Sequence, residues 1–430
     1  MISKEESYWF SNAILVPFYL AGRRPAGRSR RPLHHPLRRG LLVDLRLAWE
    51  LPSGVVSIGS GKIYSGVRPE CRTGGPTVQE ARQRTRRPAG MASPPPRVCV
   101  TGGGGYIGSW LVRLLLSRGY AVHATLRDPC DPKNAHLKRL DGASEPERLR
   151  LFKADVLDSD ELSVAIAGCE GVFHVASPVP GDKVVDPESE VMAPAVKGTL
   201  NVLQVCSSRK VQKVVVVSST SAVHFNPNWP QGKPKDENCW SDRKLCMDNE
   251  NWYHVSKIVA ERTALEYAEK TGLNIVTVCP CLVFGPQLQP TVNTSNELLI
   301  YVTKGGPTVM KNILYHIVDV RDVAEALLLV YEKPESYGRY LCAPDHISTK
   351  AMVEFLKSMY PNYNYVKCSA DADIFTPISS EKLKNLGWQP RKLEETLVDS
   401  IEYYEKEGIL QDADGKSCVL PYLFRFAVEN

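Results

Sequence analysis

A glycine-rich turn between an apolar strand and an amphipathic helix is the feature that most restricts the fold of this chain. In RVCVTGGGGYIGSWLVRLLLSRG, Thr101, Gly102, Gly105 and Gly108 have the spacing T-G-x-x-G-x-x-G. Glycines at this spacing allow a tight turn, leave room for a pyrophosphate beside the backbone, and present helix N-terminal N–H groups to the anion. Because the flanking strand and helix are the context that the motif needs, we expect a dinucleotide-binding loop here.

Short apolar runs alternate with helical stretches after this turn. The runs AVHATLR, LRLFKAD, GVFHVAS, KVVVVSS and NIVTVCP read as strands, with helical stretches at 158–167, 187–208 and 252–271 among them. Strands that are apolar throughout and joined by helices indicate a parallel sheet covered on both faces. We therefore predict an α/β fold whose doubly wound parallel (Rossmann) sheet, in residues 91–280, binds a coenzyme and carries the catalytic residues.

The alternation becomes irregular beyond residue 280. SNELLIYVTKG, VRDVAEALLLVYE, TKAMVEFLKSMY and LEETLVDSIEYYEKEG have the apolar spacing of amphipathic helices, and YHIVD, RYLCA and YVKCS are short strand candidates between them. We expect residues 281–430 to form mainly a smaller, mostly helical lobe that binds the substrate.

Residues 1–90 are rich in Arg, Pro and Gly and show no sustained helical or strand period. Met91 then stands just ahead of the first expected strand. We interpret residues 1–90 as an extension without a folded role in a cytoplasmic protein; the alternative is a transit peptide that directs the protein to an organelle.

The charge and cysteine content exclude several function classes. The formal net charge is +5, but the basic excess lies in residues 1–90 and the rest is mildly acidic, so we expect no nucleic-acid partner. No apolar run is long enough to span a membrane. The 12 cysteines lack paired zinc-ligand spacing, so we expect buried thiols in a reducing compartment and no metal site.

The end of the second expected strand indicates which dinucleotide binds. ATLRDPCDPK has Arg127 where an acidic residue would accept hydrogen bonds from an adenosine ribose, with Lys133 nearby. A guanidinium can hold a 2′-phosphate that a carboxylate would repel, which favours NADPH/NADP+ over NAD. Asp155 and Val156 follow the third strand, where Asp155 could accept from the adenine amino group, while Asp158 reads as a helix N-cap.

Tyr253 and Lys257 lie one helical turn apart in NWYHVSK, so both side chains project from one face of a helix. A nearby ammonium favours the phenolate form of a tyrosine and can reach a coenzyme ribose. Ser219, at the carboxyl end of KVVVVSS, can hold a substrate oxygen. Together these residues indicate proton transfer to a carbonyl group.

These motifs resemble the extended short-chain dehydrogenase/reductases. VTGGGGYIGSWLV, LRDPCDPKNAHL, FHVASPV, ENCWSD, NWYHVSKIVAE, FGPQLQPTVN and VDVRDVAEA are similar to segments of plant cinnamoyl-CoA reductases and dihydroflavonol reductases, from about residue 97 to 410. The resemblance implies NADPH-dependent reduction of a small aromatic carbonyl compound. Ser219 would polarise the carbonyl, Tyr253 would donate the proton, and Lys257 would orient the ribose.

The resemblance also implies which residues contact the coenzyme. Arg127 and Lys133 match the family's 2′-phosphate positions, and CPCLVFGP matches the loop that meets the nicotinamide amide. The full set of expected coenzyme contacts is Thr101, Gly102, Gly105, Tyr106, Ile107, Gly108, Arg127, Lys133, Asp155, Val156, Val175, Ala176, Ser177, Tyr253, Lys257, Pro280 and Val283.

The chain departs from the cinnamoyl-CoA reductase pattern around the substrate. His254 follows the catalytic Tyr, and Leu298 and Tyr301 stand where the family has a His and a Lys that help to hold the CoA tail. An apolar residue and a phenol cannot replace two cations facing phosphates, which favours a smaller aldehyde or ketone. With Arg321, these three positions are the candidate substrate contacts.

Two other functions remain open. A nucleotide-sugar epimerase or dehydratase would share the superfamily, and a non-catalytic NADP-binding sensor would share the coenzyme loop. Arg127 argues against the epimerase, and the intact Ser219, Tyr253 and Lys257 argue against the sensor. No motif ranks CoA thioesters, aldehydes and dihydroflavonols as substrates, or distinguishes a monomer from a homodimer.

Overall fold

A computed structural model describes residues 95–371, 376–411 and 418–428. The expected extension at residues 1–90 lies outside these residues. No helix in the described ranges is long and apolar enough to cross a membrane.

The largest element is a seven-stranded sheet in which every pairing is parallel, in the order β10-β6-β5-β4-β1-β2-β3. The chain turns from one half of the sheet to the other between β1 and β4, which is the switch point where such sheets bind ligands. The strands are β1 Arg97–Thr101, β2 Ala121–Leu126, β3 Leu149–Lys153, β4 Gly171–His174, β5 Lys213–Val217, β6 Ile275–Pro280 and β10 Gly338–Cys342.

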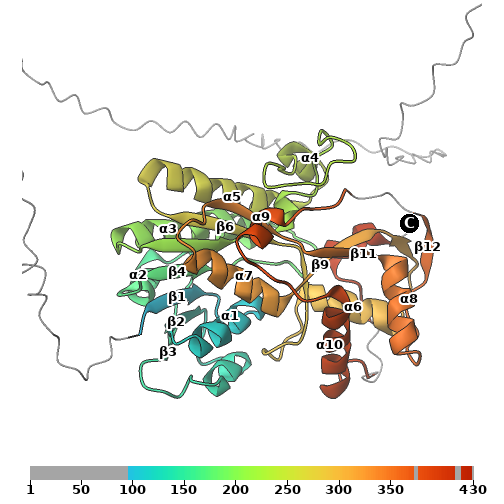
Figure 1. The fold of residues 1–430 in the computed structure, drawn as a ribbon, viewed down its shortest axis with the longest axis horizontal. Coiled ribbons are helices and arrows are strands. Elements are labelled where there is room, and N and C mark those ends of the chain that lie inside the picture. The colour runs from blue at the N-terminus through green and yellow to red at the C-terminus, as the bar shows by residue number, and fades with distance from the viewer. Residues whose placement is uncertain (1–94, 372–375, 412–417, 429–430) are drawn as a thin grey trace, which may run out of the picture. The chain divides into compact units, whose positions relative to one another are not determined.

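Helices cover both faces of this sheet (Figure 1). Helices α1 and α7 pack together on one face, while α2, α3 and α5 pack on the other. These helices are α1 Tyr106–Ser117, α2 Ser159–Ile166, α3 Gly198–Ser208, α5 Trp252–Thr271 and α7 Val320–Glu332. Asp158 caps α2 by accepting hydrogen bonds from the backbone of Asp160 and Glu161, as the sequence predicts.

Shorter helical segments fill the connections. The expected helix at 187–208 is divided, because a π-helical stretch that contains Pro194 precedes α3. The connecting segments are η2 Pro132–Arg139, η3 Glu188–Lys197, η4 Thr220–Ala222, α4 Arg243–Asp248 and α9 Glu381–Asn385.

Over its described residues, the C-terminal lobe combines four helical segments with two small sheets. Strand β9 pairs with β7 and β11, and β8 pairs with β12. The elements are β7 Leu282–Phe284, α6 Thr294–Lys304, β8 Met310–Asn312, β9 Leu314–Asp319, β11 Asp345–Ser348, α8 Thr349–Met359, β12 Cys368–Asp371, α10 Leu393–Lys406 and η5 Tyr422–Ala427.

The expected fold class, a doubly wound parallel sheet with a smaller C-terminal lobe, is confirmed. One strand lies elsewhere than its place in the sequence suggests. RYLCA follows α7 within the C-terminal part of the chain, yet as β10 it pairs with β6 and completes the edge of the large sheet.

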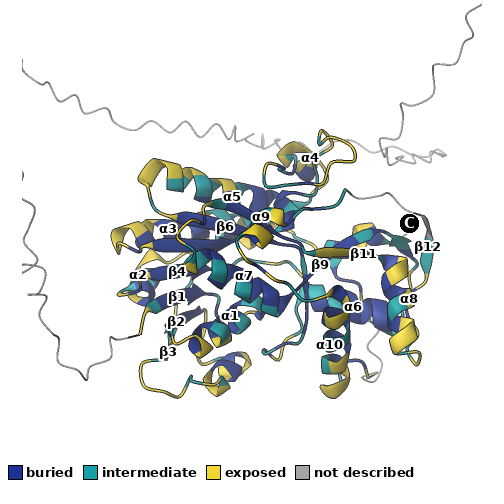
Figure 2. Cartoon of the chain, viewed as in Figure 1, coloured by how far each residue is buried: buried dark blue, intermediate teal, exposed yellow. Residues whose placement is uncertain are grey.

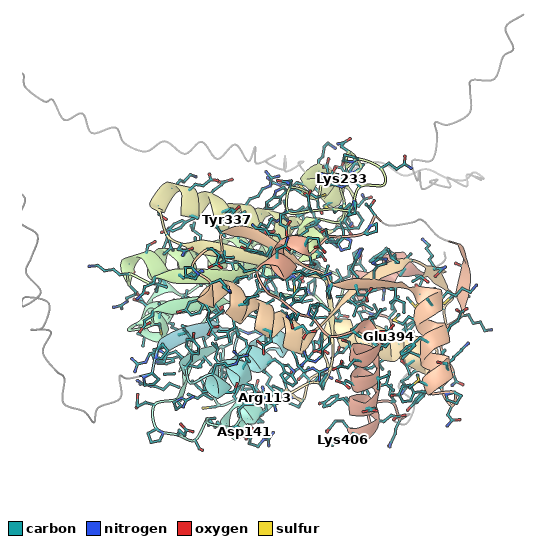
Figure 3. All side chains as sticks on the ribbon, in the orientation of Figure 1. Arg113, Asp141, Lys233, Tyr337, Glu394 and Lys406 are labelled. Atoms are coloured by element: carbon teal, nitrogen blue, oxygen red, sulfur yellow. The ribbon has the colours of Figure 1, made fainter. Side chains whose placement is uncertain are left out.

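Buried residues concentrate between the layers of the large sheet and inside the lobe, and exposed residues lie at the periphery (Figure 2). The labelled Arg113, Glu394 and Lys406 are all exposed at the periphery of the ribbon (Figure 3). Eight of the cysteines in the described ranges are buried, including Cys99, Cys279 and Cys342, in keeping with the expectation of core thiols.

A substitution of Phe173 on β4 tests the packing of the sheet against helix α7. Its side chain is fully buried, and its ring centroid lies 4.9 Å from that of Tyr331. Phe173→Ala should lower the free energy of unfolding by about 3–5 kcal/mol, measured by urea denaturation, because it leaves a cavity. Val164→Ala, on the exposed side of α2, is the control and should change it by less than about 0.5 kcal/mol. Equal midpoints for both variants would contradict this packing.

Candidate active site

The glycine-rich loop connects β1 to α1 at the switch point of the sheet. Gly102 has a φ of +67°, and a Cβ atom on Gly108 would lie 2.3 Å from the carbonyl oxygen of Gly102. Both positions therefore require glycine for the loop to close over the helix N-terminus. The loop borders a cavity of about 1230 Å³, lined also by the carboxyl ends of β2, β4 and β5 and by the C-terminal lobe.

Most of the expected coenzyme residues line this cavity. They are Gly102, Gly105, Tyr106, Ile107, Gly108, Arg127, Lys133, Asp155, Val156, Val175, Ala176, Ser177, Tyr253, Pro280 and Val283. The glycine cradle at a helix N-terminus, with cations at one end of the cavity, fits a dinucleotide with an additional phosphate.

Arg127 and Lys133 differ in their surroundings. Among the described residues no carboxylate pairs with the exposed Arg127 guanidinium. Lys133 forms an ion pair with Asp131, with Nζ 2.6 Å from Oδ2. Arg127 is therefore the cation more readily available to an anionic ligand. Asp155 accepts a hydrogen bond from the Leu157 backbone through Oδ1.

Thr101 does not line the cavity, which corrects its assignment as a coenzyme contact. It is fully buried, and its Oγ1 accepts hydrogen bonds from the backbone of Val175 and Ala176 at 3.1 Å. The same hydroxyl lies 2.9 Å from Nδ1 of His174. Thr101 therefore braces the end of β1 against β4 behind the loop.

Ser219 and Tyr253 line the cavity, and Lys257 lies beside it. Lys257 borders a small adjoining cavity that shares Ala176, Ser177 and Ser218 with the large one. Its ammonium lies 5.8 Å from the centre of the Tyr253 ring and 3.5 Å from the carbonyl oxygen of Val217. The structure thus brings together the three residues that the sequence predicts to be catalytic.

Burial controls the proton affinity of this pair. It raises the pKa of Tyr253 to about 12, and the hydrogen bond with Ser219 lowers that pKa in part. It lowers the pKa of Lys257 to about 8, against the opposing effects of Cys279 and Glu261. The expectation that Lys257 shifts Tyr253 toward phenolate is not met in this structure, because loss of hydration outweighs other effects on a buried phenol. Tyr253 is instead held protonated at neutral pH, as a proton donor must be.

A buried ion pair next to Lys257 was not predicted. Glu261, one turn beyond Lys257 on α5, accepts hydrogen bonds from Ser218 at 2.7 Å and from Arg339 at 2.8 and 3.1 Å. Both partners of this ion pair are almost fully buried. The only sequence feature that could have drawn attention to Glu261 is its i, i+4 spacing from Lys257. On most helices, however, two charged residues at that spacing form a solvated pair.

Of the four expected substrate contacts, only His254 lines the cavity. Leu298 and Tyr301 are buried in the core of the lobe, and Tyr301 hydrogen bonds to Thr308. Arg321 forms ion pairs with Asp319 and Asp399. These three assignments are wrong: the side chains stabilise the lobe. Leu298 and Tyr301 therefore carry no information about a CoA tail.

The lobe contributes cavity residues that the sequence did not indicate. Among them are Tyr315 and His316 from β9, and Phe424 and Phe426 from η5. His224, which follows η4 in the large-sheet domain, also lines the cavity. Segment η5 is held across this end by a hydrogen bond from the Tyr422 backbone to the carbonyl oxygen of Gly181. Because η5 is far along the sequence from the other site residues, no local sequence pattern indicates that it lines the cavity.

Comparison with known proteins places this architecture in a family. Residues 98–343 match the model of the NAD dependent epimerase/dehydratase family. The chain belongs to that family. It is 43% identical over 320 residues to cinnamoyl-CoA reductase 1 of Petunia hybrida, which covers 73% of this chain and 93% of the relative.

Solved structures of other reductases have a similar fold. Vestitone reductase from alfalfa superposes with a TM-score of 0.64 at 32% identity, covering 73% of this chain and 99% of that one. Yeast methylglyoxal/isovaleraldehyde reductase in complex with NADPH gives a TM-score of 0.63 at 25% identity, covering 73% and 99%. The chain is thus an NAD(P)-dependent oxidoreductase of the cinnamoyl-CoA reductase and dihydroflavonol reductase branch.

The lowered pKa of Lys257 predicts a pH dependence of stability. Between pH 8 and the usual lysine range, the unfolded chain binds a proton that the folded chain has released, so stability rises with pH. Lys257→Met removes this effect. The free energy of unfolding of the variant should exceed that of the wild type by about 3 kcal/mol at pH 7 and by less than about 1 kcal/mol at pH 10. Any change in packing adds a constant to both differences. Urea denaturation at the two pH values measures the difference, and a pH-independent difference would contradict a desolvated ammonium.

Proposed function

We propose that the protein is an NADPH-dependent carbonyl reductase that transfers hydride to the carbonyl group of a phenylpropanoid-like substrate, which is an aldehyde, a ketone or a CoA thioester. The observation that carries the proposal is the convergence of Ser219, Tyr253 and Lys257 beside a cavity that begins at the glycine-rich loop. The relatives are named as reductases of aromatic or small carbonyl compounds, which supports the same reaction.

The coenzyme, when bound, supplies a hydride to the carbonyl carbon. The Ser219 hydroxyl would donate a hydrogen bond to the carbonyl oxygen and so favour negative charge on it. Tyr253 would transfer its phenolic proton to that oxygen, which gives the alcohol. The ammonium of Lys257 would hold the coenzyme ribose.

Arg127 would select NADPH. Its guanidinium lines the coenzyme end of the cavity and pairs with no carboxylate in the described part of the chain. A planar, permanently charged donor suits a 2′-phosphate. Lys133 would add a second charge after exchanging its ion pair with Asp131.

Tyr253→Phe tests the proton donor. The variant should lose at least about a hundredfold in kcat because no acid remains at the carbonyl oxygen, while NADPH still binds with wild-type affinity. NADPH oxidation is followed with feruloyl-CoA, cinnamaldehyde-type aldehydes and dihydroflavonols in parallel, and coenzyme binding by calorimetry. Tyr337→Phe, at an exposed position labelled in Figure 3, is the control. Retention of full activity by Tyr253→Phe would mean that another group is the acid.

Arg127→Gln tests the coenzyme preference. Loss of a charge-assisted hydrogen bond should raise KM for NADPH about tenfold or more and leave KM for NADH nearly unchanged. Arg113→Gln, at an exposed arginine on α1 that packs on Trp110, is a matched control that keeps the wild-type ratio. An equal rise for both coenzymes would contradict a role in recognising the 2′-phosphate.

A further inference from the structure

The short helix η2, Pro132–Arg139, lies against the glycine-rich loop. A Cβ atom on Gly104 would lie 2.2 Å from Oδ1 of Asn134, a residue of η2 that lines the cavity. Gly104 occupies a position that the spacing T-G-x-x-G-x-x-G leaves open, so the motif alone does not require glycine there. The close approach of η2 explains this glycine, because a side chain on residue 104 would displace Asn134.

The segment that joins Arg127 to Lys133 is a loop closed by hydrogen bonds. The backbone N–H of Asp131 and Nδ2 of Asn134 both donate to the carbonyl oxygen of Asp128. Oδ1 of Asp131 caps η2 by accepting a hydrogen bond from the Lys133 backbone. These bonds hold the backbone between the two cations in one shape. A separate contact must hold that segment against the glycine-rich loop.

His136 connects η2 to the helix that follows the glycine-rich loop. Its Nδ1 lies 2.8 Å from the carbonyl oxygen of Lys133, and its Nε2 lies 2.8 Å from Oγ of Ser109 on α1. The Ser109 hydroxyl is also 3.2 Å from the carbonyl oxygen of Gly103 in the loop itself. One imidazole ring therefore joins the backbone at Lys133 to the glycine-rich loop through a single serine.

The partners of His136 determine where its ring proton lies. A carbonyl oxygen only accepts, so the N–H of a neutral ring is on Nδ1 and donates to Lys133. Nε2 is then an acceptor, and the Ser109 hydroxyl donates to it. Burial lowers the pKa of His136 below its ordinary value, against the opposing effect of the bond to Lys133, so the ring is neutral at pH 7.

This connection is buried and lies outside the cavity. Ser109 is fully buried, His136 is 5% exposed, and Leu137, the next residue, is fully buried in the core of the large sheet. Ser109 and His136 do not line the cavity, whereas Lys133 does. A dinucleotide in the cavity would therefore meet Lys133 and not the imidazole. The ring can influence such a ligand only through the position of Lys133.

We propose that His136 is a positioning residue for the coenzyme: bonded between Ser109 and the Lys133 carbonyl, it holds Lys133 within reach of the 2′-phosphate of NADP(H). The proposal rests on the proposed preference for NADPH and names a residue that maintains it. The glycine-rich loop keeps contacts of its own, including a hydrogen bond from the Gly103 backbone to the carbonyl oxygen of Thr125. Binding of NAD+, which has no 2′-phosphate, should therefore not depend on His136.

Calorimetric titration of the full chain with NADP+ and NAD+ tests the proposal. His136→Phe keeps a flat ring but loses both hydrogen bonds. It should raise the Kd for NADP+ about three- to tenfold and change the Kd for NAD+ by less than about twofold. Ser109→Ala should give the same shift, and the double variant should bind no more weakly than either single one, because each removes the same connection. An equal loss for both dinucleotides would overturn the proposal, since the ring would then support the glycine-rich loop rather than Lys133.

Two comparisons separate positioning from a structural role. In a Lys133→Met background, His136→Phe should have no further effect on NADP+ binding, because the residue through which it acts is gone. A further loss of about three- to tenfold in that background would contradict the proposal. His123→Phe is the matched control: His123 is a buried histidine on β2 whose Nδ1 lies 2.7 Å from the carbonyl oxygen of Ala165, and it does not line the cavity. This control should keep the wild-type ratio of the two Kd values.

The binding measurements also distinguish this proposal from the proposed reaction, because NADP+ binding requires no carbonyl substrate. If the chain reduces no carbonyl compound but His136→Phe weakens NADP+ binding selectively, the positioning stands and the reaction is wrong. If the wild type prefers NADP+ and His136→Phe keeps that preference in full, the positioning is wrong and the proposed function stands. Equal wild-type Kd values for NADP+ and NAD+ would overturn both the coenzyme preference and the role of His136.

Discussion

The position of helix α5 against the sheet depends on one buried carboxylate. Glu261 accepts hydrogen bonds from Ser218 after β5, Thr277 on β6 and Arg339 on β10. Arg339 in turn stacks 3.6 Å from the centre of the Trp240 ring. An uncompensated buried charge is strongly unfavourable, so α5 can neither slide nor rotate without breaking several of these contacts together. Because Tyr253 and Lys257 lie on the same helix, this contact set also positions the two candidate reacting groups.

The same burial that positions the reacting groups sets their protonation. A phenol far from water stays protonated, and an ammonium far from water releases its proton more easily. Glu261 counteracts the second effect by raising the pKa of Lys257 toward its ordinary range. The Glu261 carboxylate therefore has two effects. It fixes the position of helix α5, and it helps to keep Lys257 positively charged beside Tyr253.

Local patterns identified the parts of the fold that local chemistry determines. The glycine loop, six strands of the large sheet and helix α5 were predictable because each is specified by neighbouring residues: apolar runs, helical spacing and glycine where a side chain cannot fit. The pairing of β10 with β6 was not predictable, because an apolar strand that follows a helix can join the large sheet or a sheet of the lobe. Glu261 and Arg339 are 78 residues apart, and neither residue alone indicates a buried ion pair.

The errors in the candidate site have the same origin. Leu298 and Tyr301 were chosen by alignment with a motif, which gives the helix but not the side of the helix that faces the cavity; both side chains face the lobe core. Thr101 belongs to the glycine motif, yet its hydroxyl points to the backbone after β4 rather than to a ligand. Conversely, His316 and η5 line the cavity because the lobe folds back over the sheet. No local sequence pattern in VDVRDVAEA or the adjacent segments indicates this arrangement.

The cavity is electrostatically asymmetric, and the asymmetry follows from the fold. Its coenzyme end is built from loops at the carboxyl ends of parallel strands, where Arg127 is exposed. Its far end lies between the sheet and the lobe, where His254 and His316 are buried and titrate far below neutrality. A charged group placed there would lose hydration without gaining a counter-ion. Among the described residues, the permanently cationic side chains that line the cavity, Arg127 and Lys133, are therefore confined to its coenzyme end.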